Sequence, residues 1–162
     1  MATADKSASP RAVPMPKDAI AMLRADHRKV SALFDDFEAA RSTAKKKMLV
    51  AQICEELTVH TALEEEVFYP AVKAALRDKE LVPEATVEHA SVKDLIAQVK
   101  DVEPDGEMYD AKVKVMSEFV KHHVKEEQNE MFPKAQKTRL DMVALRDEML
   151  ARKQALLAQA ST

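Results

Sequence analysis

Two segments of this chain repeat one another, and the repeat constrains the fold more than any other feature. HTALEEEVFYP occupies residues 60–70 and HVKEEQNEMFP occupies residues 123–133. Both begin with His, carry Glu four residues later and end in an aromatic residue followed by Pro. A second pair of motifs, Asp26-His27 and Glu88-His89, has nearly the same separation, 62 residues against 63. We therefore expect two related halves, each contributing the same polar groups.

Residues that favour helices dominate the sequence, whereas residues that favour turns and strands are few. The 162 residues include one glycine, Gly106, and no tryptophan, while Ala, Lys, Glu, Leu and Met are frequent. Hydrophobic residues make up 46% and charged residues 33%, which is typical of a globular chain and not of a disordered one. This composition predicts an all-α fold.

Apolar residues recur at helical spacing in five stretches, which predict five helices. Their expected ranges are 17–40, 44–77, Pro83 to a break at 103–106, 107–132 and 139–160. Pro70 is expected to kink the second helix near its end. Ser42-Thr43 is expected to cap the second helix, and a capping-box-like pattern, Thr138-x-x-Asp141, to begin the fifth.

Short links between long helices favour neighbours that run antiparallel. We therefore predict an up-down-up-down antiparallel four-helix bundle over residues 17–134, with an additional C-terminal helix in residues 135–162. This last helix is expected to cover one flank of the bundle or to bind a partner. Residues 1–16 hold three of the seven prolines and are expected to form a mobile N-terminal tail.

Charge and hydropathy argue against several classes of partner. The net charge is −3 and the pI is about 6.0, so neither a nucleic acid nor a membrane surface is expected to bind. No apolar run is long enough to span a membrane, and the first sixteen residues lack the apolar segment of a signal peptide. Cys54 is the single cysteine, so we expect a reducing, cytoplasmic location. The oligomeric state does not follow from the sequence.

Six polar residues lie on the helix stripes that should face the core. They are His27, His60, Glu64, His89, His123 and Glu127. An unpaired buried charge costs several kcal/mol, so six polar side chains on the stripes that face the core need a common explanation. Residues four apart share one face of a helix, which applies to His60 with Glu64 and to His123 with Glu127. Each half is thus predicted to offer two imidazoles and one carboxylate to a shared region.

This set of donors suits two metal ions. Neutral imidazole binds first-row transition metals, and a carboxylate between two cations can bridge them. Iron or manganese fits better than zinc, for which four ligands at one ion suffice, or calcium, which prefers oxygen ligands. Three protein ligands per ion plus bridges leave room for water, dioxygen, peroxide or a similar small ligand.

The same residues resemble the hemerythrin-like (HHE cation-binding) domain family over about residues 17–134. The resemblance rests on Asp26-His27, on His60 and Glu64 with Phe68-Tyr69-Pro70, on Glu88-His89, and on His122-His123 and Glu127 with Met131-Phe132-Pro133. It implies a non-haem site of two iron ions, Fe²⁺ or Fe³⁺, with an oxo or hydroxo bridge and with Glu64 and Glu127 as bridging carboxylates. It also implies dioxygen, nitric oxide, iron or peroxide as the ligand.

The sequence departs from oxygen-carrying hemerythrins in two places. Those proteins have a second histidine one turn after the third-helix histidine, where this chain has Lys93. Their fourth-helix carboxylate is Asp, five residues after the histidine, whereas Glu127 lies four residues after His123 and five after His122. The internal repeat favours His123 as the ligand and leaves His122 beside the site or on the surface.

Three functions are consistent with these residues. The first is a diiron-binding protein that binds dioxygen or responds to iron or oxidative stress. The second is a diiron catalase or peroxidase that acts on hydrogen peroxide, so enzymatic activity stays open. The third is a metal-free helical bundle that docks a partner. Tyr69 and Cys54 are expected to be core residues, and Asp26 and Glu88 to be solvated or to orient a ligand.

Overall fold

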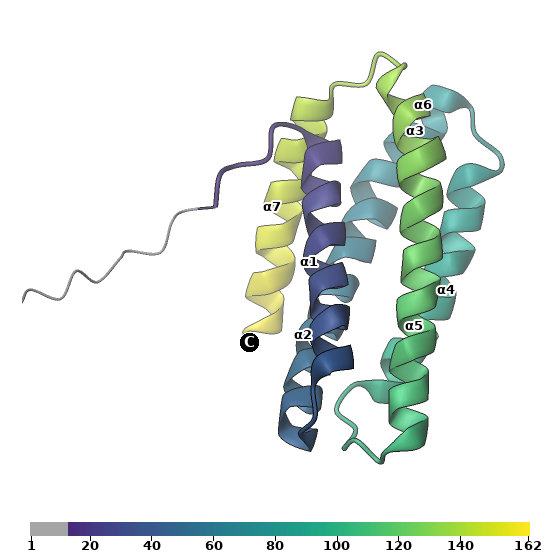
Figure 1. Cartoon of the computed structure of the whole chain (residues 1–162). Helices are drawn as coiled ribbons and strands as arrows, with labels where there is room; N and C mark the ends of the chain where they lie inside the picture. Colours follow the sequence, from purple (N-terminus) through teal and green to yellow (C-terminus); the bar gives the residue numbers. More distant parts are fainter. Residues whose placement is uncertain (1–12) are drawn as a thin grey trace, which may run out of the picture.

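A computed structural model describes residues 13–162 and shows an all-α fold, as predicted (Figure 1). The expected mobile tail covers residues 1–16; residues 1–12 lie outside the described part, and 13–16 have no regular secondary structure. The helical elements are α1 (Ala19–Ala39), α2 (Thr43–Leu63), η1 (Glu64–Phe68), α3 (Tyr69–Leu76), α4 (Leu81–Val99), α5 (Glu107–Glu126), η2 (Glu127–Met131), α6 (Phe132–Gln136) and α7 (Met142–Ala160).

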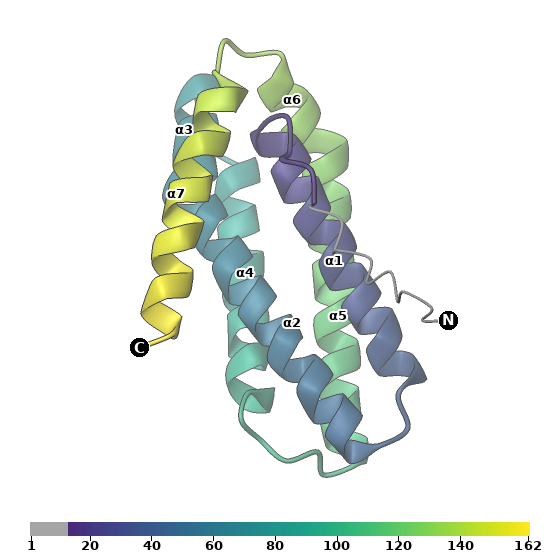
Figure 2. The same cartoon turned by 90° about the vertical axis from the view of Figure 1, so that its left-hand side faces the viewer.

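The elements form four long helical rods that run alternately up and down (Figures 1 and 2). The first and third rods are α1 and α4, while α2–η1–α3 and α5–η2–α6 each form one continuous rod. The main packing partners are α1 with α2 and α4 with α5, so each half of the repeat forms one antiparallel helical hairpin. The predicted four-helix bundle with an added C-terminal helix is confirmed.

Side-chain caps fix where several helices begin. Asp18 accepts a hydrogen bond from the backbone N–H of Ala21, and Ser42 accepts one from Lys45. The last helix begins at Met142 and is capped by Asp141. The capping-box-like pattern in the sequence places this cap three residues earlier, at Thr138. Thr138 instead donates its hydroxyl hydrogen to the carbonyl of Ala135, which closes the preceding turn.

The third rod begins two residues earlier than predicted, at Leu81. The carboxylate of Asp78 accepts hydrogen bonds from the backbone N–H groups of Leu81 and Val82, at 3.0 and 2.7 Å. This carboxylate replaces the missing partners of the first turn, so the helix does not depend on Pro83 for its start. Pro83 sits inside the first turn, where its lack of an N–H costs nothing.

A short π-helical segment precedes each of the two prolines that end the repeated motifs. In η1 the backbone N–H of Tyr69 donates to the carbonyl of Glu64, and in η2 that of Phe132 donates to the carbonyl of Glu127. Pro70 and Pro133 have no N–H to offer an α-helical partner, so a wider turn costs less here than elsewhere. The irregularity expected at Pro70 is therefore a π turn in an otherwise continuous rod.

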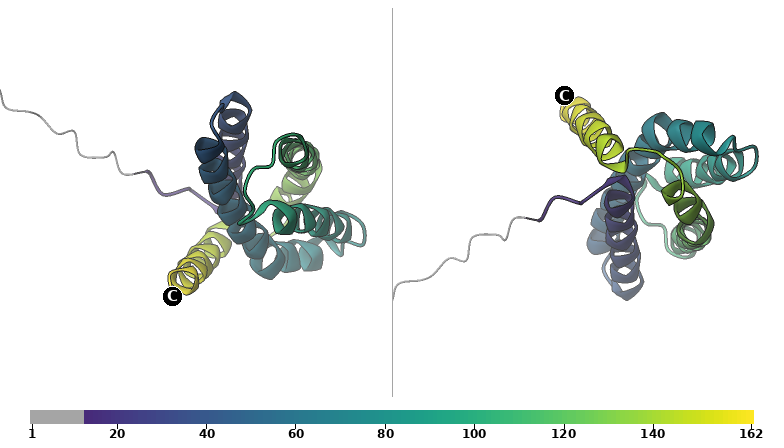
Figure 3. Two further views of the ribbon diagram at one scale, coloured as in Figure 1. Left: turned by 90° about the horizontal axis from the view of Figure 1, so that it is seen from below. Right: turned by 90° about the horizontal axis from the view of Figure 1, so that it is seen from above.

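The C-terminal helix α7 covers one flank of the bundle, one of its two expected roles. It packs against α1, α2 and η1, and the end-on views show it outside the four rods (Figure 3). Leu145 and Met149 of α7 are buried in the core cluster they share with these helices. The guanidinium of Arg152 donates to the carboxylate of Glu66, which ties α7 to η1 at the surface.

The core consists of two apolar clusters separated along the bundle axis. One contains Leu23, Leu63, Phe68 and Phe132, and the other contains Val30, Ile53, Val92 and Met116. The six predicted polar residues come between them in each rod, so they form a polar layer across the middle of the bundle. None of the helices in residues 13–162 combines the length and apolar character needed to cross a membrane.

Candidate metal centre

The structure brings all six predicted residues together in the buried polar layer. His27, His60, His89, His123, Glu64 and Glu127 are all buried, although they come from four different rods. The neighbouring His122 points outward, with 63% of its side chain exposed. Of the two histidines that the sequence left as alternatives, His123 is thus the one that joins the cluster.

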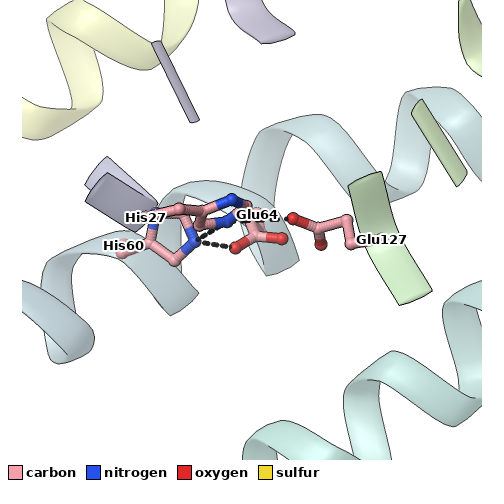
Figure 4. Close-up of side chains that lie close together, drawn as sticks. All are labelled: His27, His60, Glu64 and Glu127. Atoms are coloured by element: carbon pink, nitrogen blue, oxygen red, sulfur yellow. Dashed lines mark hydrogen bonds and ion pairs between the residues drawn. The ribbon is translucent and has the colours of Figure 1, made fainter. Parts of the chain in front are cut away.

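The first group consists of His27, His60, Glu64 and Glu127 (Figure 4). The Nε2 atoms of His27 and His60 lie 3.2 Å apart. Nε2 of His60 also contacts Oε1 of Glu64, its neighbour one turn along the same rod. Nε2 of His27 lies 3.2 Å from Oε1 of Glu127, which arrives from the opposite hairpin. Four potential ligand atoms therefore converge within 4.8 Å of one another.

The second group consists of His89, His123 and Glu64, and it mirrors the first. The Nε2 atoms of His89 and His123 lie 3.2 Å apart. Oε2 of Glu127 lies 3.4 Å from Nε2 of His123, while Oε1 of Glu127 faces the first pair of histidines. Both carboxylates therefore lie between the two pairs of imidazoles, where each could contact two ions.

Each of the four imidazoles is held from behind through its Nδ1 atom. Oδ2 of Asp26 is hydrogen-bonded to Nδ1 of His60 at 3.0 Å, and Oε1 of Glu88 is hydrogen-bonded to Nδ1 of His123 at 3.0 Å. The remaining pairs are Gln128 with His27 at 2.9 Å and Glu65 with His89 at 3.1 Å. Each partner oxygen can only accept a hydrogen bond from the ring, so the proton of a neutral imidazole sits on Nδ1. The Nε2 lone pairs then point inward, as they do in metal-binding histidines.

When all four imidazoles are neutral, the inward-pointing lone pairs leave the layer short of positive charge. Two Nε2 lone pairs 3.2 Å apart would then repel each other, whereas nitrogens that share one ion at about 2.1 Å lie about 3 Å apart. Within the described residues, no donor hydrogen-bonds to either oxygen of Glu64 or to Oε1 of Glu127. Burial raises the pKa of the Glu64 carboxyl, and the charge of Glu127 raises it further. Cations between these groups would satisfy every one of these atoms, so the donor set fits metal ions.

Tyr69 is a site residue that the sequence reasoning assigned to the core. Its hydroxyl donates a 2.6 Å hydrogen bond to Oε2 of Glu127 and lies 3.3 and 3.2 Å from Nε2 of His89 and His123. Phe132 occupies the equivalent position in the other half and stacks on His27 at 6.0 Å, as Tyr69 stacks on His89 at 5.4 Å. The approximate two-fold symmetry of the site is therefore broken by one hydroxyl group.

Residues next to the predicted ligands also serve the site. Glu65 and Gln128 each follow a core carboxylate and hold a histidine of another rod, a role that the sequence reasoning did not give them. The repeat itself carried the signal, because both positions are polar and equivalent. Asp26 and Glu88 each orient a histidine of the following rod, His60 and His123, and not the histidine that follows them in the sequence.

Lys93 takes the place of the additional histidine of oxygen-carrying hemerythrins and lies outside the site. Its ammonium group donates a 2.6 Å hydrogen bond to Oε2 of Glu65, and 48% of its side chain is exposed. Burial raises the pKa of the Glu65 carboxyl, but the hydrogen bonds from Lys93 and His89 outweigh burial and lower it. Lys93 therefore keeps Glu65 ionised as the partner of His89.

Comparison with known proteins agrees with this geometry. Residues 18–135 match the family described as Hemerythrin HHE cation binding domain. A crystal structure of a hemerythrin HHE cation binding domain-containing protein from Mycobacterium kansasii superposes with a TM-score of 0.75 and 22% identity, over 88% of this chain and 89% of that one. A protein named DNA nickase from Nostoc sp. is 30% identical over 111 residues, which are 68% of this chain and 31% of the length of that protein.

Proposed function

This chain belongs to the hemerythrin HHE cation-binding domain family, and we propose that it holds two iron ions in its polar layer and binds a small oxidant through them. The observation that carries the proposal is the convergence of four inward-facing Nε2 atoms on two buried carboxylates, of whose four oxygens only Oε2 of Glu127 has a hydrogen-bond donor, Tyr69, among the described residues. Bound iron would supply Lewis acidity and a change of oxidation state.

The residues divide naturally between two ions. His27 and His60 would hold one ion, and His89 and His123 would hold the other. Glu64 and Glu127 would bridge, because each carboxylate lies between the two imidazole pairs. Mixed nitrogen and oxygen donors suit iron or manganese, whereas a set rich in carboxylates would suit calcium. The six side chains leave coordination positions open for an external ligand.

The space next to the layer limits that ligand to a very small molecule. A cavity of about 20 Å³ is lined by the four histidines and by apolar residues that include Val30, Leu57, Val92 and Val120. A volume of this size holds one water-sized molecule, not an organic substrate. Its apolar wall suits dioxygen or nitric oxide. Binding of dioxygen, or a response to iron or oxidative stress, is our first candidate.

Removal of hydrogen peroxide is the second candidate, and the Tyr69 hydroxyl favours it. Converting two peroxide molecules into dioxygen and two waters moves protons between oxygen atoms, which requires groups that hold a proton at the reacting centre. Tyr69 holds a proton 2.6 Å from the Glu127 carboxylate, inside the layer. Burial and the charges of Glu64 and Glu127 raise the pKa of Tyr69 well above its usual value, so the phenol keeps its proton.

Elemental analysis combined with a peroxide assay tests the proposal. The protein purified from iron-replete cells should contain two irons per chain and absorb in the near ultraviolet. His123→Ala should lose iron, whereas Lys121→Ala, an exposed residue of the same helix, should retain it. A reversible spectral change on removal of dioxygen would favour oxygen binding, and rapid dioxygen release from peroxide would favour the enzyme. Colourless, metal-free protein would contradict both and leave the partner-binding helical bundle.

The DNA-cleaving activity in the name of the Nostoc relative is not part of this proposal. The matched region is 31% of that protein, and the net charge of the present chain is −3, which does not favour binding to a polyanion. We also propose the reducing cytoplasm as its location, because Cys54 is a free, buried thiol.

A further inference from the structure

The two hairpins present equivalent outer faces, and α7 covers the first of them. It packs against α1 and α2, the hairpin that carries His27 and His60 (Figures 2 and 3). The equivalent face of α4 and α5, which carries His89 and His123, is not packed against α7. The repeat allows the two faces to be compared position by position.

On the covered face the route to the polar layer is closed by apolar packing. Val59 and Leu63 pack into the cluster that α7 completes with Met149, and Leu63 is fully buried. Lys153 of α7 places its ammonium group 4.0 Å from Oδ1 of Asp26, the oxygen that does not hold His60. Both the packing and the positive charge oppose the approach of a cation from this side.

On the open face the corresponding positions carry metal-binding side chains. In the internal repeat, His122 is equivalent to Val59 and Glu126 is equivalent to Leu63. Nε2 of His122 lies 3.1 Å from Oε1 of Glu126 and 3.5 Å from Oε2 of Glu88. One ligand atom from each of the three residues lies within 4.8 Å of the others. A histidine and two carboxylates at this spacing suit a divalent first-row cation.

A narrow cleft connects this cluster with the polar layer. It has a volume of about 10 Å³ and is lined by Glu84, Glu88, Glu126, His123 and Glu127, among others. Glu127, which is 2% exposed, lies at the inner end: its Oε2 atom lies 3.4 Å from Nε2 of His123, and its Oε1 atom, which faces His27, accepts no hydrogen bond within the described residues. Glu88 contacts both the cluster and the polar layer, because its Oε1 atom accepts a hydrogen bond from His123 while its Oε2 atom faces His122.

We propose that Glu88, His122 and Glu126 form an uptake site where a divalent cation binds before it moves along the cleft to Glu127 and the buried centre. The inference rests on the proposed function, since it requires that the polar layer takes up metal ions. Acidic residues along the cleft raise the local concentration of cations, which increases the rate of association. The cluster determines how fast ions arrive and not how many ions the centre holds.

The rate of loading separates these two effects. Metal-free full-length protein is mixed with Co²⁺ in a stopped-flow instrument, and the visible absorption of Co²⁺ bound to nitrogen and oxygen ligands reports arrival at the centre. The double variant His122→Ala/Glu126→Gln leaves the six inner residues and their four Nδ1 partners intact. It should load at least about tenfold more slowly and reach the same endpoint by elemental analysis.

Glu148→Gln serves as the matched control, because it removes one exposed carboxylate from α7, on the opposite flank. It should load at the wild-type rate. Equal rates in the double variant and the wild type would overturn the uptake site while leaving the buried centre intact. A lower endpoint at an unchanged rate would also overturn it, because the cluster would then hold ions permanently. Wild-type protein that binds no Co²⁺ would instead refute the proposed function.

A second measurement observes the cluster directly. Protein whose centre is filled with diamagnetic Zn²⁺ is titrated with Mn²⁺, which binds more weakly to nitrogen and oxygen donors and should leave the Zn²⁺ in place. Mn²⁺ at the cluster should broaden the imidazole proton signals of His122 at lower concentrations than signals elsewhere on the surface, and Glu126→Gln should weaken this effect. Uniform broadening over the surface would contradict the proposal.

Discussion

Tyr69 and Phe132 occupy equivalent positions in the two hairpins and differ by one hydroxyl group, which bonds to Glu127 at 2.6 Å. Each ring stacks on a histidine of the adjacent rod, Tyr69 on His89 and Phe132 on His27. The two sides of the polar layer therefore share a framework but not a chemistry. An ion beside His89 would lie next to a proton donor, whereas an ion beside His27 would lie next to a hydrocarbon ring.

Replacing Tyr69 with phenylalanine tests the contribution of this hydroxyl. Tyr69→Phe should lower the free energy of unfolding of the metal-free protein by about 1–3 kcal/mol, because the buried Glu127 carboxylate loses its donor. Tyr109→Phe is the matched control, since the Tyr109 hydroxyl is buried without a hydrogen-bond partner among the described residues, and its removal should cost nothing. Urea unfolding measures both, and equal effects of the two variants would contradict this account.

The position of Tyr69 shows what periodicity could and could not predict. In an uninterrupted α-helix, residues nine apart differ by about 180° in direction, so Tyr69 should point away from His60. The π segment η1 stacks residues five apart instead, and this places Tyr69 above Glu64. The rods and all six core polar residues followed from helical spacing and the internal repeat, whereas a residue beyond the π turn could not be placed from that spacing.

Contacts between rods were also beyond the reach of sequence periodicity. The spacing showed that Asp26 and Glu88 lie near a histidine, but not that each reaches the histidine of the next rod. Glu65 and Gln128 fall just off the apolar stripe, so helical spacing did not show that each reaches a histidine of another rod. The docking of α7 on one hairpin has no counterpart in the repeat, so nothing in the duplicated segments could indicate which face it covers.

Removing the partner of one histidine should weaken metal binding without unfolding the bundle. Asp26→Ala takes away the carboxylate that holds Nδ1 of His60, so the ring loses its orientation and its tautomer. The affinity for Co²⁺ should fall by about 10–100-fold. Asp35→Ala, which removes an exposed carboxylate from the same helix, should leave the affinity unchanged. Competition with a chelator measures both variants, and unchanged affinity in Asp26→Ala would show that this hydrogen bond is unimportant.

The pH dependence of the metal-free protein should be opposite to that of metal binding. Burial lowers the pKa of His123, but the hydrogen bond and charge of Glu127 outweigh burial and raise it to about 9 from 6.5. A raised pKa stabilises the metal-free fold fully below pH 6.5, and this contribution is lost as the pH rises through about 9. A cation must displace the same proton, so metal affinity should increase over this range.

Two titrations check this prediction. The melting temperature of metal-free protein should decrease between pH 6.5, the ordinary pKa of histidine in the unfolded chain, and about pH 9, the pKa of His123 in the folded protein. The affinity for Co²⁺ should increase over the same interval. His123→Ala should flatten the stability curve in this range. Stability and affinity that rise together would mean that His123 is neutral in the metal-free protein.

Cys54 should be inert as a thiol. It is 2% exposed, and burial raises its pKa to about 11, so little thiolate is present at neutral pH. Iodoacetamide should alkylate the native protein at least about 100-fold more slowly than the urea-unfolded protein, a difference set by the thiolate fraction and by access. Mass spectrometry follows the reaction, and fast modification of the native state would instead make Cys54 a candidate redox sensor.

The docking of α7 should depend on its buried methionine. Met149 is fully buried in the cluster with Leu63, so Met149→Ala should cost about 2–5 kcal/mol of unfolding free energy through lost contacts and a cavity. Val143→Ala, at an exposed position in the first turn of the same helix, should cost about 0.5 kcal/mol or less. Amide exchange should also become faster along α7 in Met149→Ala before it does so in α4 and α5. If both hairpins lost protection together, α7 would be part of the cooperative core and not a separate cover on one face.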